Sequence, residues 1–247
     1  MLAIRHSQAT RSNEALQQVR PRQRESNRAW LRRVGATSGI LLLGGNSLTH
    51  FRIRVAQSHV RHDLLPSFWS FVGILEDNQT FASVPFNWSA DAAEVPRING
   101  VQSCRLADYD DPLRFPNIAV LQFTDDVRPI HEHIERVKVQ RSVLDRPTLM
   151  LPWLGYLWSA GPAGNPLLAG HGLPSAAFVE TVYGLARIEL APGLSSAASC
   201  PEAIWAAAKW WHPFYGQGMG GEDATHAGAR LPNGHFAMRQ PAAAVVE

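Results

Sequence analysis

The sequence has no long run of apolar residues. Its densest one, Ile-Leu-Leu-Leu at positions 40–43, is far shorter than the ~20 residues that a helix needs to cross a bilayer. The first residues also lack the continuous apolar stretch of a secretory signal peptide. We therefore expect no membrane span, and a cytoplasmic site of action unless export uses a route that needs no such signal.

Cysteine is scarce as well. The chain has two, Cys104 and Cys200, and neither has a second cysteine at the spacing of a metal site. Two cysteines in 247 residues cannot form a disulfide framework. We expect both to be buried, unreactive thiols.

Several motifs of cofactor and catalytic sites are missing. The Gly-Gly-Asn-Ser segment at 44–47 lacks the lysine of a phosphate-binding loop, and no Gly-x-Gly-x-x-Gly or Gly-x-Ser-x-Gly is present. His131 and His133 would point about 200° apart on a helix and could not share a metal ion. His59 and His62 are spaced for a base or a metal, although a polar loop is the simpler interpretation. We predict no metal and no cofactor.

Lysine is rare, and charge is unevenly distributed. Of the 23 basic residues 21 are arginine, which suggests a coding bias and weakens any argument for nucleic-acid binding. Residues 1–35 carry eight arginines against two glutamates, a net charge of +6, so residues 36–247 carry −4 of the total of +2. Such an arm could contact nucleic acid, an acidic membrane surface or an acidic protein, and an acidic protein is the partner we favour. A solvated leader is the simpler alternative.

The composition is that of a folded chain, with 45% apolar and 18% charged residues. We expect an Arg-rich arm at 1–35, one domain at 36–212, and a Gly- and Pro-rich tail at 213–247 that forms a loop or is disordered. Apolar periodicity predicts strands near 40, 71, 81 and 119, the middle two forming a hairpin. Helices are predicted from 48, from 129 to Pro147, from Ser175, and from a capping box of Ser199 and Glu202. A Pro- and Gly-rich joint is predicted at 152–174.

The segment Ser-Ala-Ala-Phe-Val at 175–179, continued by Leu-Ala-Arg-Ile-Glu-Leu-Ala-Pro-Gly at 185–193, resembles the nucleophile helix of circularly permuted papain-like hydrolases. These are the NlpC-like amidases and their lecithin:retinol acyltransferase-like relatives. The resemblance places Ser175 at the position of the catalytic cysteine. It implies an α+β, papain-like fold, in which an antiparallel sheet packs against the nucleophile helix.

The upstream half of the family pattern is a strand that carries the catalytic histidine. Trp-Ser-Phe-Val-Gly-Ile-Leu at 69–75 resembles that strand, with Phe71 in place of the histidine. The third catalytic position falls near 82–84, where Ala-Ser-Val offers no carboxylate or amide, and the Ser-Gly-Ile-Leu-Leu-Leu strand at 38–43 lacks the family's aspartate. A serine hydroxyl needs a strong neighbouring base, and Phe71 cannot be one. Together these substitutions indicate lost chemistry, with Phe71 expected to face Ser175.

Three interpretations follow. The first is a degenerate member that keeps the fold as a binding or scaffolding module, with a cleft for a peptide, a peptidoglycan fragment or an acyl group. The second is an active amidase, peptidase or acyl hydrolase whose base is His59, His62 or His171, including the case in which Ser175 replaces a catalytic cysteine. The third is an unrelated α+β interaction protein. In the first and third, Ser175 is an ordinary helix cap.

Tryptophan is abundant, with eight in the chain. We expect most to be in the core. Trp210 and Trp211, at a helix end before the glycine-rich tail, could instead form an exposed patch for a protein partner or a carbohydrate.

Overall fold

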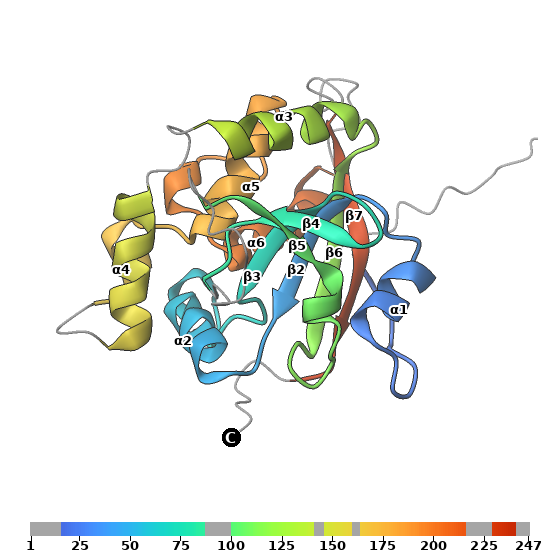
Figure 1. The fold of residues 1–247 in the computed structure, drawn as a ribbon, viewed down its shortest axis with the longest axis horizontal. Helices are drawn as coiled ribbons and strands as arrows, with labels where there is room; N and C mark the ends of the chain where they lie inside the picture. The colour runs from blue at the N-terminus through green and yellow to red at the C-terminus, as the bar shows by residue number, and fades with distance from the viewer. Residues whose placement is uncertain (1–15, 87–99, 141–145, 160–163, 216–228, 241–247) are drawn as a thin grey trace, which may run out of the picture.

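The computed structural model describes residues 16–86, 100–140, 146–159, 164–215 and 229–240. These residues form a mixed sheet of seven strands in the order β1-β7-β6-β2-β3-β4-β5, packed with helices on both faces (Figure 1). Every neighbouring pair is antiparallel except β1 and β7, which are parallel. The expected α+β class and the antiparallel pairing of the strands near 40, 71, 81 and 119 are confirmed.

The elements have the following bounds. The strands are β1 (Gln17–Gln18), β2 (Gly39–Gly44), β3 (Phe71–Leu75), β4 (Thr80–Ser83), β5 (Gln102–Arg105), β6 (Asn117–Thr124) and β7 (Ala229–Met238). The α-helices are α1 (Asn27–Arg33), α2 (Leu48–Ala56), α3 (Arg128–Val139), α4 (Arg146–Trp158), α5 (Pro174–Leu185) and α6 (Pro201–Tyr215). Short 3-10 turns are η1 (Ser58–Val60), η2 (Leu106–Tyr109), η3 (Pro166–Ala169) and η4 (Ser196–Ala198).

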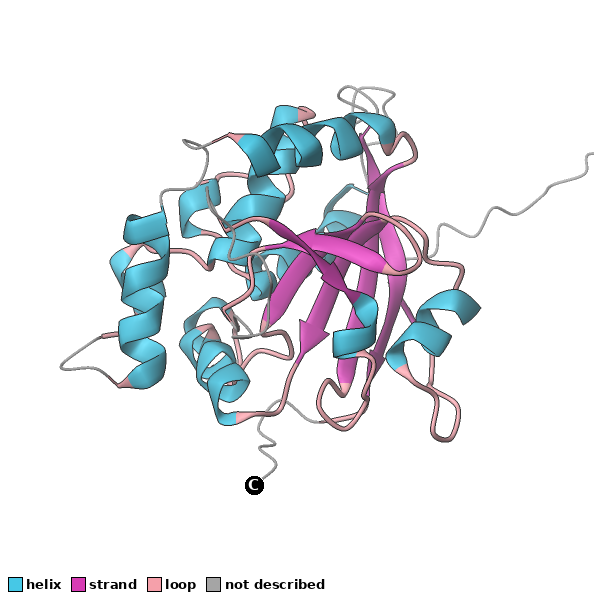
Figure 2. Cartoon of the chain, in the orientation of Figure 1, coloured by secondary structure: helices cyan, strands magenta, loops and turns pink. Residues whose placement is uncertain are grey.

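Strand β2 is buried along its whole length because it lies between β3 and β6 and is covered on both faces. Its continuous apolar run fits that position, since a strand that is solvated on one face would alternate. Two cores result. The larger contains side chains of α2 to α6, and the smaller contains those of α1 and η2 on the opposite face. Figure 2 shows most of the helices gathered to one side of the sheet.

The Gly-Gly-Asn-Ser segment joins β2 to α2. A Cβ atom on Gly44 would overlap the carbonyl oxygen of Phe68, and one on Gly45 would lie 2.5 Å from the His50 ring. Glycine is therefore required by close packing. The side chain of Ser47 caps α2 by accepting a hydrogen bond from the His50 N–H.

The expected arm and tail do not stand apart from the domain over their described residues. Strand β1 pairs with β7, and β7 pairs with β6 over most of its length. Trp30 of α1 is fully buried, and its indole N–H donates to the carbonyl of Val19 at 3.1 Å. Segments on both sides of the predicted boundaries near 35 and 213 thus supply strands to one sheet.

The expected joint at 152–174 contains most of α4, which continues through Pro152. Trp153 fixes this helix, because its side chain is fully buried and its indole N–H donates to the carbonyl of Gly172 at 2.8 Å. Proline at 152 removes one donor but does not end the helix here. Among the helices of the described residues, none has the length and apolar character to span a membrane.

Candidate functional site

The helix that the sequence singled out, α5, begins as predicted. Pro174 occupies its first turn, where the missing N–H costs no hydrogen bond, and Leu173 precedes it in an extended conformation. Ala176, Ala177 and Phe178 follow and join the larger core. Ser175 is thereby fixed in the first turn, at the end of the helix where the backbone N–H groups favour an anion.

The hydroxyl of Ser175 is sealed in this core. The residue is 0% exposed, and its Oγ is buried with no hydrogen-bond partner among the described residues. A hydroxyl becomes a nucleophile when an adjacent base accepts its proton and a substrate reaches it. In the described part of the chain, Ser175 has no hydrogen-bonded base, and its burial leaves no path for a substrate to reach the hydroxyl.

Phe71 does not face Ser175. Alternate residues of a strand point to opposite faces of the sheet, so Val72 and Ile74 join the larger core with α5, while Phe71 joins the smaller one. There its ring stacks on Tyr109 with centroids 5.5 Å apart and meets Phe81 edge to face. The sequence-based expectation that these two side chains meet is wrong, because β3 turns position 71 away from the helix.

The third catalytic position also provides no orienting group. Ala82 and Val84 lie in the larger core, and Ser83 donates its hydroxyl hydrogen bond to the carbonyl of Val72 at 2.6 Å. This serine serves the pairing of β3 and β4. It adds no carboxylate or amide to the neighbourhood of α5.

The three candidate bases lie in different environments. His59 is exposed, with its Nδ1 atom 3.1 Å from the carbonyl oxygen of Ala56. His171 is half-buried, and its backbone is held by hydrogen bonds to Pro166 and from Trp153. His62 is exposed and lines a cavity described below. None of the three hydrogen bonds to Ser175.

A buried polar network, which sequence reasoning missed, surrounds the first turn of α6. The Ser67 hydroxyl donates to Glu202 Oε2 at 2.6 Å and accepts from the Trp69 N–H at 2.9 Å. The Glu202 N–H donates to Gln57 Oε1 at 2.9 Å, and Gln57 in turn donates to the carbonyl of Trp69. The predicted capping box is therefore absent, since Glu202 bonds to Ser67 and the Ser199 hydroxyl donates to Glu180. These partners are far apart in the chain, so no local spacing could have found them.

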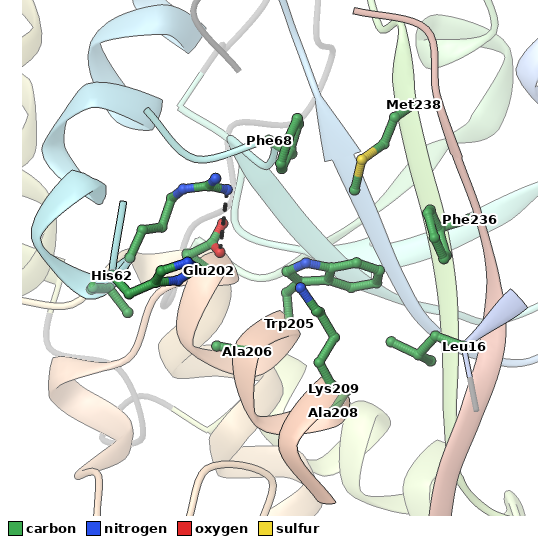
Figure 3. A pocket seen from close by; sticks show the side chains of 12 residues that line it. Leu16, His62, Phe68, Glu202, Trp205, Ala206, Ala208, Lys209, Phe236 and Met238 are labelled. Atoms are coloured by element: carbon green, nitrogen blue, oxygen red, sulfur yellow. Dashed lines mark ion pairs between the residues drawn. The ribbon is translucent and has the colours of Figure 1, made fainter. Parts of the chain in front are cut away.

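A cavity of about 620 Å³ opens beside this network. It lies between α6, the edge formed by β1 and β7, and the segment that follows η1. Its lining, drawn in Figure 3, consists of Leu16, Val60, Arg61, His62, Phe68, Glu202, Trp205, Ala206, Ala208, Lys209, Phe236 and Met238. The volume falls within the ~300–1,000 Å³ typical of small-molecule sites.

The charged side chains of the cavity differ in whether they already have a partner of opposite charge. Burial raises the pKa of Glu202, while the Ser67 hydrogen bond and the charges of Arg61 and Lys209 act in the opposite direction. Arg61 Nη1 lies 3.7 Å from Glu202 Oε1, and its Nε donates to Asp63 at 2.8 Å. Lys209 is exposed, with its ammonium 5.9 Å from the centroid of the Trp205 ring. Among the described residues, Lys209 makes no ion pair.

The tryptophan pair at the end of α6 is only partly exposed. Trp210 is 48% exposed, whereas Trp211 is half-buried and its indole N–H donates to the carbonyl of Leu190. The two rings lie 6.5 Å apart in an edge-to-face arrangement. One of the two therefore packs on the domain, and Trp210 is the exposed member of the predicted patch.

The prediction that both cysteines are buried is confirmed. Cys104 and Cys200 are buried and unpaired, and burial raises the pKa of each thiol to about 12. Within the described residues, no group of three or more histidine, cysteine, aspartate or glutamate side chains is arranged to hold a metal ion.

Comparison of the chain with models of protein families, with curated proteins and with solved structures gave no match.

Proposed function

We propose that this protein is a binding module that holds a small ligand in the cavity beside α6 and does not use Ser175 as a nucleophile. In this proposal the chain has a papain-like fold of amidase or acyltransferase ancestry and has lost the catalysis of that ancestry. One observation carries the argument. The Ser175 hydroxyl is sealed and has no base among the described residues, while a cavity of ligand size is open elsewhere.

The surroundings of Ser175 support the loss of catalysis. Nucleophilic hydrolysis needs a polar cleft in which a base, an orienting group and oxyanion donors converge. Around the start of α5 the neighbours are apolar core side chains, and none of His59, His62 and His171 hydrogen-bonds to Ser175. Restoring a thiol at position 175 would place it where neither a substrate nor an imidazole of the described residues reaches it.

The cavity supports binding. It combines a large apolar surface with a few polar groups at one end, the combination that small-molecule sites use for affinity and orientation. Its rigid parts come from a helix and a strand, α6 and β7, which are joined to the rest of the sheet. Phe68 and Arg61 are already packed against each other, with the guanidinium 4.8 Å from the ring centroid. The site is thus formed before a ligand arrives.

The experiment is a hydrolysis assay of the wild-type protein and the Ser175→Cys and Ser175→Ala variants. The substrates are acyl esters and peptidoglycan fragments, the classes cleaved by the families that the chain resembles. We expect all three proteins to hydrolyse them at the same rate as a buffer blank. Turnover by wild type that Ser175→Ala abolishes, or robust turnover by Ser175→Cys, would show that a working base is present and would overturn the proposal.

A further inference from the structure

The cavity has two chemically different ends (Figure 3). Phe236, Met238 and Leu16 form an apolar wall on one side, and Glu202 and His62 form a polar one on the other, where Arg61 Nη1 lies 3.7 Å from Glu202 Oε1. The ring of Trp205 lies between the two, and the side chain of Lys209 extends along it. A ligand that fills the cavity must therefore have an apolar body and one polar group.

The apolar end favours an aromatic body. Trp205 already makes edge-to-face contacts with Trp69 and with Phe236, at centroid distances of 5.0 and 5.2 Å. A further ring placed in the cavity would extend this cluster by the same geometry, which adds to the energy of area burial alone. Met238 adds a flexible side chain whose sulfur interacts favourably with rings and adapts to their outline.

The polar end favours a negative charge. Glu202 is 5% exposed and already accepts a hydrogen bond from Ser67, so its carboxylate has little capacity left for a cationic ligand. An ammonium group would also have to compete with Arg61 for that carboxylate. The ammonium of Lys209, by contrast, makes no ion pair with any described residue; this exposed side chain places it 5.9 Å from the centroid of the Trp205 ring.

We propose that this cavity binds an aromatic monocarboxylic acid, with its ring against Trp205, Phe236 and Met238 and its carboxylate paired with Lys209. This inference rests on the proposed binding function and names the ligand class for the same site.

The test compares three probes that share a phenylpropyl body: 3-phenylpropionate, 3-phenylpropanol and 3-phenylpropylamine. Affinities are measured by titration calorimetry at neutral pH and low salt, because the ion pair is partly exposed and salt would screen it. We expect 3-phenylpropionate to bind about tenfold more tightly than the alcohol, the size of effect expected of one charge-assisted contact. The amine should bind more weakly than both.

Two variants test whether the charge of Lys209 causes the tighter binding of the acid. Lys209→Met keeps an unbranched side chain only one atom shorter and removes its charge, so it should abolish the difference between the acid and the alcohol and leave the affinity for the alcohol unchanged. The matched control is Arg136→Met, which removes an exposed cation from α3, outside the cavity lining. It should change none of the three affinities.

The outcomes separate this inference from the proposed function. If the alcohol or the amine binds as tightly as the acid, the ligand class is wrong while binding in the cavity stands. The ligand class is equally wrong if Lys209→Met leaves the preference for the acid intact. If none of the three probes binds to the folded wild-type protein, the ligand class is overturned, and the hydrolysis assay of the Ser175 variants decides separately whether the chain is an enzyme.

Discussion

Helices α5 and α6 begin in the same way and end up in opposite environments. Each has a proline as its first residue, followed at once by a polar one, Ser175 in α5 and Glu202 in α6. Ser175 is enclosed among apolar side chains, with its hydroxyl unpaired among the described residues. Glu202 is bonded to Ser67 and Gln57 and lines an open cavity. The start of a helix is therefore not a site by itself, because access and partners decide what it can do.

The buried carboxylates of the two helices also differ, because only one of them has cationic side chains nearby. Burial raises the pKa of Glu180, in the second turn of α5, to about 7, although the carboxylate accepts a hydrogen bond from Ser199 at 3.1 Å. No cationic side chain of the described residues opposes that shift. Burial also raises the pKa of Glu202, but there the charges of Arg61 and Lys209 oppose it. The carboxylate of α5 is thus the costlier one to ionise.

Of the changes that would reveal the difference between α5 and α6, replacing Glu180 should have the largest effect on the free energy of unfolding. The folded protein holds the Glu180 proton more tightly than the unfolded chain does, so the contribution of Glu180 to the free energy of unfolding should fall as pH rises from about 4.5 to about 7. The fall is on the order of 2–3 kcal/mol. Glu180→Gln should remove most of it and be the more stable protein at pH 8, as measured by urea denaturation at a series of pH values.

The exposed Glu132 of α3 provides the control, since Glu132→Gln should leave the pH dependence of the wild type in place. The pH dependence that persists in Glu180→Gln would belong to the other buried groups, chiefly Glu202, whose pKa is also raised, and His50, whose pKa is lowered to about 4 by burial and acts in the opposite direction. A Glu180→Gln variant with the full wild-type slope would show that the two carboxylates do not differ as described.

Replacing two buried serines, Ser67 and Ser175, should change the free energy of unfolding by smaller amounts and in opposite directions. Ser67 and Ser175 are both 0% exposed, but Ser67 makes two hydrogen bonds through its hydroxyl and Ser175 makes none with the described residues. Ser67→Ala leaves buried partners unpaired and should lower the free energy of unfolding by about 2 kcal/mol. Ser175→Ala removes an unpaired hydroxyl and should raise it by about 1 kcal/mol. Both values come from urea titrations, and a loss of stability in Ser175→Ala would mean that its hydroxyl has a partner.

Most of the strands and helices could be predicted from the sequence because their apolar patterns lie within short segments of the chain. The apolar run at 40–43 predicted the central strand, and Ile130, Ile134 and Val137 predicted the buried face of α3. Strand β7 was missed because it lies in a stretch of small and polar residues and is stabilised by pairing with β6, a contact between segments far apart in the chain. Helix α4 was missed because Pro152 reads locally as a helix breaker.

The candidate site was beyond sequence reasoning for two physical reasons. First, the face to which Phe71 points depends on strand register, and a shift of one residue turns a side chain to the other side of the sheet. Second, the network at Glu202 joins positions separated by 135 and 145 residues. The local signal, Ser199 followed three residues later by Glu202, predicts a capping box, whereas these two side chains bond to Glu180 and Ser67.

The most direct test of the central claim compares how accessible the start of α5 and the cavity beside α6 are to a reagent in solution. Ser175→Cys and Ala206→Cys place a thiol at the start of α5 and in the cavity beside α6, in a protein whose own two cysteines are buried. Labelling with a chromogenic disulfide under native conditions should be fast for Ala206→Cys. For Ser175→Cys it should be as slow as for the wild type. Rapid labelling of Ser175→Cys would place position 175 in an open cleft and contradict the account.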